Sequence, residues 1–202
     1  MNLSSVFLLF LTVSLCGILV LNSSAFTNYD VGQPSPIKIE IEAVSGGDRY
    51  NDTARFQDNV LILRHAGGKS VPLDSLSVQI VGIGNSYKGI PGSGGEFLFG
   101  DLVVYYEHLN IDKKNPQFEK NNRETLKDGL WSSGEILILT GNDSKNSSST
   151  SVFVSVNGDS GTSQNYGFSS QTAAEIFVFQ NSAQSKHLLF KKKISFSKSR
   201  PT

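Results

Sequence analysis

Residues Ile37 to Ala43 read IKIEIEA, and this stretch decides the fold class of the 202-residue chain. Apolar and charged side chains alternate along it, which places Ile37, Ile39 and Ile41 on one face of an extended segment. Such alternation is typical of a β-strand that buries one face and leaves the other in water. The stretch therefore predicts a strand near the start of a folded domain.

The same alternation recurs along the chain in short segments separated by Gly, Asn, Ser and Asp. It marks Val60 to Arg64, Leu76 to Gly82, Leu102 to Tyr106, Ile136 to Thr140, Val152 to Val156, Glu175 to Phe179, and a C-terminal pair at Leu188 to Phe190 and Ile194 to Phe196. Strands this short must bury one face against another sheet. We therefore expect an all-β fold over residues 37–202, an antiparallel β-sandwich of the immunoglobulin-like kind.

Three glycine-rich or polar stretches predict long surface loops. They are Gly82 to Gly100, Asn110 to Lys127, and Gly141 to Ser151. Loops longer than about 12 residues without structure of their own are normally functional or mobile. We expect these three to be the places where the domain makes variable contacts.

The charge composition argues against nucleic-acid partners. Lys plus Arg equals Asp plus Glu at 18 each, so the chain has no overall field that would attract a polyanion. A local excess of lysine occurs near the C-terminus, where Lys residues alternate with Phe190, Ile194 and Phe196. We interpret this segment as a last strand with a solvated basic face, and a basic docking surface is the alternative.

The N-terminal sequence predicts a membrane segment. Val6 to Leu21 carries no charge, and its length lies between a signal-peptide core and a spanning helix, which needs about 20 residues. Ser23 and Ala25 fit the small-residue pattern of a cleavage site, whereas the lack of Lys or Arg before the run favours a retained anchor. We expect residues 1–25 to form an apolar helix, anchor or signal peptide, joined by the linker 26–36 to a domain outside the cytoplasm.

Catalytic motifs are weak in this chain. Gly158 to Gly161 reads GDSG, the nucleophile signature of trypsin-like proteases, but Thr162 stands where that family has another glycine. Asn157-Gly158 directly after a predicted strand is a strong turn signal, so a hydrolase using Ser160 is the weakest alternative. Isolated His residues and the single cysteine, Cys16, offer no zinc spacing. We expect no metal, no cofactor and no enzymatic activity.

Three asparagines are candidates for N-glycosylation. Asn51, Asn142 and Asn146 each begin an N-x-[ST] triplet, and the last two fall in a predicted polar loop. A glycan attached there would meet no obstruction, provided that the host has the machinery.

Two segments resemble the archaeal type IV pilin family. In the first, Asn59 to Val71, an early strand ends in His65-Ala66-Gly67-Gly68; in the second, Trp131 and Gly134 precede a further strand. The resemblance covers roughly residues 37–140. Glycine at positions 67 and 68 supplies positive φ angles for a turn, and Trp131 offers a large side chain that closes the end of a sandwich.

The resemblance implies a structural or adhesive subunit at the cell surface, membrane-anchored or extracellular. Its partners would be copies of itself or other pilin-like subunits of a pilus, with the apolar N-terminal segments packed together or held in the membrane. Met1 to Ser5 does not match the basic, glycine-ended cleavage motif of that family. The alternative is a monomeric binding module, secreted or anchored, whose long loops hold another surface component.

Overall fold

The fold is given by a computed structural model that describes residues 37–46, 56–88, 94–110, 115–143, 151–159, 163–170 and 172–197. The chain divides into two units, residues 1–33 and 34–202, and the described residues all belong to the second. The predicted membrane segment, residues 1–25, and the linker 26–36 lie outside the described residues.

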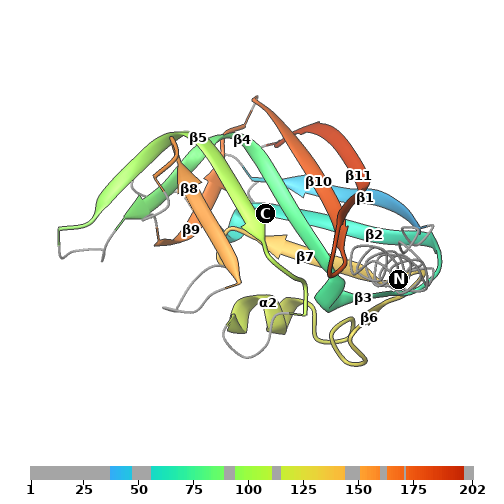
Figure 1. Cartoon of the computed structure of the whole chain (residues 1–202). Helices are drawn as coiled ribbons and strands as arrows, with labels where there is room; N and C mark the ends of the chain where they lie inside the picture. The colour runs from blue at the N-terminus through green and yellow to red at the C-terminus, as the bar shows by residue number, and fades with distance from the viewer. Residues whose placement is uncertain are drawn as a thin grey trace, which may run out of the picture. The chain divides into compact units, whose positions relative to one another are not determined.

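The described part of the chain consists mainly of antiparallel strands, so the all-β prediction is confirmed (Figure 1). A three-stranded sheet contains, in order, β1 (Ile37–Ser45), β2 (Val60–Gly68) and β7 (Ile136–Thr140). A six-stranded sheet contains, in order, β11 (Lys186–Ser195), β10 (Ala173–Asn181), β4 (Leu76–Lys88), β5 (Glu96–Tyr106) and β8 (Val152–Val156), with β9 (Ser163–Phe168) also paired to β4. The short strands β3 (Val71–Pro72) and β6 (Leu130–Trp131) pair with each other, and the helices are η1 (Phe56–Asp58), η2 (Leu73–Ser75) and α2 (Pro116–Asn121).

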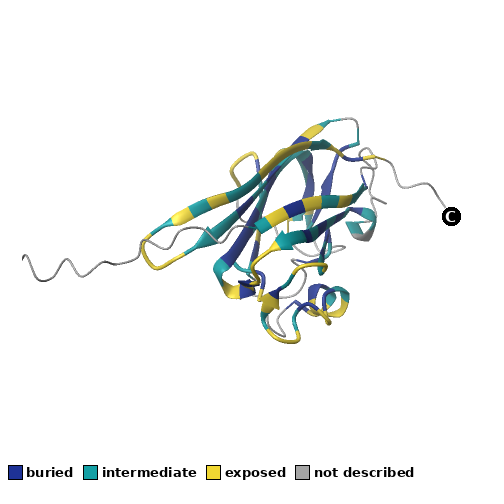
Figure 2. Cartoon of the chain, turned by 90° about the vertical axis from the view of Figure 1, so that its right-hand side faces the viewer, coloured by how far each residue is buried: buried dark blue, intermediate teal, exposed yellow. Residues whose placement is uncertain are grey.

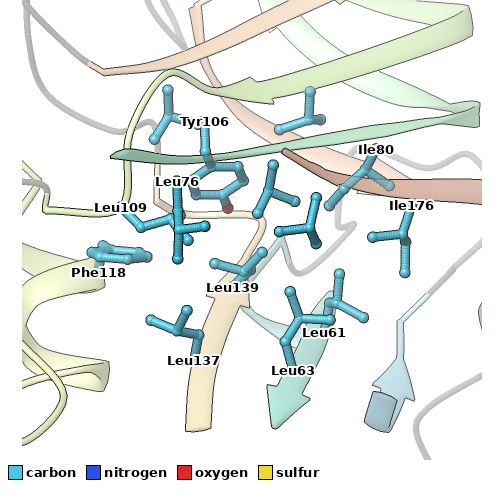
Figure 3. Packing of buried hydrophobic residues seen from close by; sticks show 14 of the residues in the cluster. Leu61, Leu63, Leu76, Ile80, Tyr106, Leu109, Phe118, Leu137, Leu139 and Ile176 are labelled. Carbon is cyan, nitrogen blue, oxygen red and sulfur yellow. The ribbon is translucent and has the colours of Figure 1, made fainter. Parts of the chain in front are cut away.

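The hydrophobic core lies between the two larger sheets. Figure 3 shows Leu61 and Leu63 of β2 and Leu139 of β7 facing Ile80 of β4 and Ile176 of β10, and all five side chains are buried. Along the strands, buried residues alternate with partly or fully exposed ones (Figure 2). The fold is therefore sandwich-like, and burial of these apolar side chains is its main source of stability.

The prediction of a surface loop from Gly82 to Gly100 is wrong, because most of this segment forms strands. β4 continues to Lys88 and β5 begins at Glu96, and the two strands pair along this whole length. The other edge of β4 pairs first with β10 and then with β9. A Cβ atom at Gly84 would overlap the backbone oxygen of Gly167, so this glycine permits close approach of two strands instead of a turn.

Other expectations also need correction. The predicted loop Asn110 to Lys127 contains α2, and the predicted C-terminal pair of strands is the single strand β11. Phe118 of this helix is fully buried, whereas Pro116, Glu119 and Lys120 are exposed. At six residues it is the longest helix of the described residues, and none of the helices there is long and apolar enough to span a membrane.

The outer edge of β7 is covered by side chains that follow α2. The amide of Asn122 accepts a hydrogen bond from the Ile138 backbone nitrogen at 2.7 Å and donates one to the Ile138 oxygen at 2.9 Å. Thr125 donates to the Ile136 oxygen at 2.8 Å. These side chains take the place of a neighbouring strand, so the Ile138 groups and the Ile136 oxygen are not free to pair with another chain.

Removing the Asn122 amide is expected to destabilise the fold. We expect Asn122→Ala to lower the free energy of unfolding by about 2 kcal/mol, because it leaves the Ile138 backbone groups without partners. Chemical denaturation followed by circular dichroism measures the change. Asn121→Ala is the matched control, since that side chain only accepts a bond from Gln117 one turn earlier. Equal effects of the two substitutions would contradict the role given to Asn122.

Candidate functional site

A row of side chains crosses the outward face of the six-stranded sheet. Strand register places Phe153 of β8 beside Tyr105 of β5, and Tyr105 beside Gln79 of β4. It then places Gln79 beside Phe177 of β10, and Phe177 beside Lys191 of β11. The first four of these residues each stand between two buried neighbours in their own strand, so they point away from the core. These five residues are called the aromatic row below.

Further apolar side chains extend the row along the strands. Phe179 lies two residues beyond Phe177 on the same face, and Leu188 of β11 pairs with it. Phe153 is 49% exposed and Leu188 is 52% exposed, values that few large apolar residues of the described chain reach. Contiguous exposed apolar surface of this kind marks interaction sites in soluble domains. The aromatic row together with Phe179, Lys186 and Leu188 is called the aromatic face.

Two lysines of β11 lie over the rings of this face. The Lys186 ammonium nitrogen is 4.1 Å from the ring centre of Phe179 and 4.8 Å from that of Tyr105. The Lys191 nitrogen is 5.0 Å from the ring centre of Phe177. The ring centres of Tyr105 and Phe153 are 6.5 Å apart. Cation–π contacts at exposed positions are worth only about 0.5–1 kcal/mol each, so these lysines can move aside for a partner.

The charge of the face is positive toward β11. Lys191 forms an ion pair with Glu175 at 3.4 Å, and Lys186 and Lys193 add further positive charge on the same side of the sheet. At the opposite edge, β8 contributes the uncharged residues Phe153 and Ser155. The aromatic face is therefore apolar at one edge and basic at the other.

A second, fully buried cluster of polar groups joins the ends of four elements. The Tyr106 hydroxyl donates to Asp143 Oδ2 at 2.9 Å and lies 2.7 Å from the Tyr166 hydroxyl. Thr140 donates its backbone N–H to Asp143 Oδ2 at 2.7 Å and its hydroxyl to Oδ1 at 2.6 Å. The Asn115 amide donates to the Asp143 backbone oxygen. The cluster ties β5, β7, β9 and the start of α2 together, which is a structural role.

Burial dominates the electrostatics of this cluster. It raises the pKa of Asp143 from 3.8 to about 7, although the bonds from Thr140 and Tyr106 act in the opposite direction. Burial also raises the pKa of Tyr106 and Tyr166 well above the usual tyrosine range. The Asp143 carboxyl is therefore the group in the described chain whose charge state is most closely coupled to folding near neutral pH.

The residues that carry the pilin resemblance come together at one corner of the fold. The rings of His65 and Trp131 meet edge to face with centres 5.4 Å apart, and Gly134 donates its N–H to the His65 oxygen at 2.7 Å. Gly67 and Gly68 have φ angles of 151° and 106°, so the positive values predicted for them are present. Trp131 is completely buried. These contacts give the five residues a packing role at the end of β2.

Hydrogen bonds settle the tautomer of His65. Its Nε2 atom lies 3.0 Å from the Lys69 backbone oxygen, which can only accept, so Nε2 carries the proton. Its Nδ1 atom then accepts from the Gly67 backbone nitrogen at 3.3 Å. Both ring nitrogens of His65 are thus hydrogen-bonded within the turn that the ring stabilises.

The remaining predicted site residues are dispersed. Asn142 is half-buried in the turn after β7, between the buried residues Gly141 and Asp143. Asn51, Asn146 and Ser160 lie outside the described residues. Glycosylation therefore stays a prediction at all three asparagines.

The Asn-Gly turn after β8 is present. Asn157 and Gly158 have φ angles of 53° and 81°, as a tight turn between strands requires. The Asn157 amide accepts from the Asp101 nitrogen at 2.9 Å and donates to the Phe99 oxygen at 3.0 Å. The GDSG signature thus begins in a turn that is held by β5.

Other surfaces of the described chain are less suggestive. Two open depressions flank α2 and are lined mainly by Lys120, Asn121, Arg123, Glu124 and Lys127. Within the described ranges no His, Cys, Asp and Glu residues cluster as metal ligands would.

The sequence predicted the strands that carry the aromatic face, but it did not predict the face itself.

Comparisons of the chain with protein families, with curated proteins and with solved structures found no match. The functional conclusion therefore depends on the geometry of the aromatic face.

Proposed function

We propose that this chain is a structural or adhesive surface subunit that contacts its partners through the aromatic face. The observation that carries the proposal is the aromatic row, with Phe153 49% exposed at one end of it. Burying a large apolar side chain is worth about 1.5–3 kcal/mol, so covering this row would reward association. The domain does not need this row for folding, because the hydrophobic core lies on the other side of the sheet.

The sequence supports the surface location. The apolar residues 1–25 would attach the chain to a membrane or direct its export, and the pilin-like segments around His65 and Trp131 favour a subunit of a pilus or a related assembly. We also propose that the sandwich has immunoglobulin-like connectivity and that an apolar helix precedes it at the N-terminus. A monomeric binding module is the competing function, and it would use the same face for a foreign component.

Localisation of the chain in sheared surface material tests the proposal. We expect immunogold electron microscopy to find the wild-type chain in surface assemblies, and a Tyr105→Ser/Phe177→Ser variant to be lost from them at least about tenfold. Leu130→Ser is the matched control, because Leu130 is an exposed apolar residue, 36% accessible, on β6.

Two outcomes would overturn the proposal. One is absence of the wild-type chain from surface assemblies, with the protein found only as a monomer. The other is assembly of the double variant at the wild-type level while circular dichroism shows that it is folded.

A further inference from the structure

The aromatic row is its own complement when it is reversed. Across the strands it reads Phe153, Tyr105, Gln79, Phe177, Lys191. Laid on its own reverse, it sets Phe153 opposite Lys191, Tyr105 opposite Phe177, and Gln79 opposite Gln79. A two-fold axis through Gln79 would bring these residues together in the same pairs on both copies, so complementarity depends on the chemistry of each pair.

We propose that the occupant of the aromatic face is a second copy of this chain, in a two-fold dimer whose axis runs parallel to β4 through Gln79. The inference rests on the proposed function, since it names the partner of the same face. The two sheets then pack face to face with their strands aligned, which is a common arrangement of sheets about 10 Å apart.

Each pairing in the reversed row is chemically favourable. Lys191 of one copy reaches the half-exposed Phe153 ring of the other, as it already contacts Phe177 within its own chain. Tyr105 packs on Phe177, and the Tyr105 hydroxyl stays at the rim of this contact. The two Gln79 amides each have a donor and an acceptor, so they can bond each other across the axis.

A two-fold axis in the interface plane can run along the strands or across them. The lysines of β11 favour the axis along the strands. With the axis along the strands, β11 of one copy covers β8 of the other, whose outward residues Phe153 and Ser155 carry no charge. With the axis across the strands, β11 would cover β11, and the lysines at 186, 191 and 193 would face each other at close range, with only part of their charge offset by Glu175, which pairs with Lys191. The first arrangement removes this repulsion and covers the exposed Phe153 ring.

The size of the face predicts a weak dimer. Five strands about 4.8 Å apart, with about five residues of each in contact, give a plane of roughly 24 by 17 Å. This is on the order of 400 Å² per partner, about half of the roughly 800 Å² per partner that a standard specific interface buries. We expect a dissociation constant in the micromolar range, which suits a subunit that strengthens its contacts by repetition.

Cysteine cross-linking of the full chain tests the dimer, with Cys16→Ser in every variant because Cys16 is the single native cysteine. Gln79→Cys lies on the proposed axis, but sheets about 10 Å apart hold the two Cα atoms too far apart for a direct disulfide. A short bismaleimide linker should therefore give at least about tenfold more linked dimer than with Gln184→Cys, an exposed control in the turn between β10 and β11. Non-reducing gel electrophoresis measures the product. Equal cross-linking of the two variants would overturn the proposal.

A second pair of variants keeps the test independent of how Gln79→Cys folds. A mixture of Phe153→Cys and Lys191→Cys chains should cross-link to each other more than either does to itself. Phe153→Glu should preserve or strengthen the dimer, because it sets a carboxylate opposite Lys191. Preferential self-linking of Phe153→Cys, or loss of the dimer in a folded Phe153→Glu chain, would overturn the assigned axis.

Failure of the dimer is distinguishable from failure of the proposed function. If cross-linking shows no dimer but the Tyr105→Ser/Phe177→Ser variant is still lost from surface assemblies, the second copy is ruled out as the occupant and the contact function stands. If the dimer forms but the chain is absent from surface assemblies, the dimer stands and the surface function is ruled out.

Discussion

The free energy of unfolding of this protein is expected to fall as the pH rises from about 4 to about 7, and Asp143→Asn is expected to remove most of that dependence. The Asp143 carboxyl is completely buried among Tyr106, Tyr166 and Thr140, and burial raises its pKa from 3.8 to about 7. Below pH 3.8 the group is protonated in both the folded and the unfolded chain, and the stability that this provides is fully present.

Between these two pH values the unfolded chain releases the Asp143 proton while the folded chain retains it. The unfolded state is then favoured progressively, by an amount on the order of 4 kcal/mol when the pH passes the folded pKa. Above about pH 7 the dependence ends, because both states have lost the proton. Chemical denaturation at closely spaced pH values measures this slope directly.

Asp159→Asn is the control for the titration of Asp143. Asp159 is an exposed carboxylate that pairs with Lys88 at 2.6 Å, so its removal should leave the slope between pH 4 and 7 intact. Asp143→Asn also loses an acceptor for Thr140, so it changes the absolute stability; the readout is therefore the slope. A wild-type slope in Asp143→Asn would show that the carboxyl is not buried as a neutral group.

Two strands were predictable from the sequence down to their ends. Ile136–Thr140 and Val152–Val156 have the predicted bounds because polar turn residues flank both short, largely apolar segments. The prediction of a loop from Gly82 to Gly100 was wrong because its glycines were interpreted as turn formers. At Gly84 the missing Cβ instead makes room for the backbone of β9, which no local pattern reveals.

The aromatic face depends on strand order, which is why the sequence did not predict it. Phe153, Tyr105 and Phe177 are far apart in the chain and become neighbours only through β8, β5, β4 and β10. A usable signal was present, since each ring occupies an outward position between apolar residues, as Phe153 does in Val-Phe-Val. Asp143 left no signal, because it lies in a polar run that resembles an ordinary loop.

Trp131→Ala is expected to lower the free energy of unfolding by about 3–5 kcal/mol, the range for loss of a buried large aromatic side chain. Trp131 is completely buried, its ring meets that of His65 at 5.4 Å, and its indole nitrogen donates to the Glu135 oxygen at 3.3 Å. The cavity would also loosen the turn after β2, because the bonded His65 ring loses its packing partner. Trp131 is the single tryptophan, so the variant has no tryptophan fluorescence to report unfolding. Circular dichroism is therefore the measurement to use.

The neighbouring residue provides the contrast for Trp131. Leu130 is on the same short strand but is 36% exposed, so Leu130→Ala should cost less than about 1 kcal/mol. Trp131→Phe retains an aromatic ring beside His65 while losing the indole N–H and some volume, so its cost should fall between the two. If Trp131→Ala and Leu130→Ala prove equally mild, the corner formed by His65 and Trp131 contributes little, and the pilin-like segments would lose the packing role that the structure gives them.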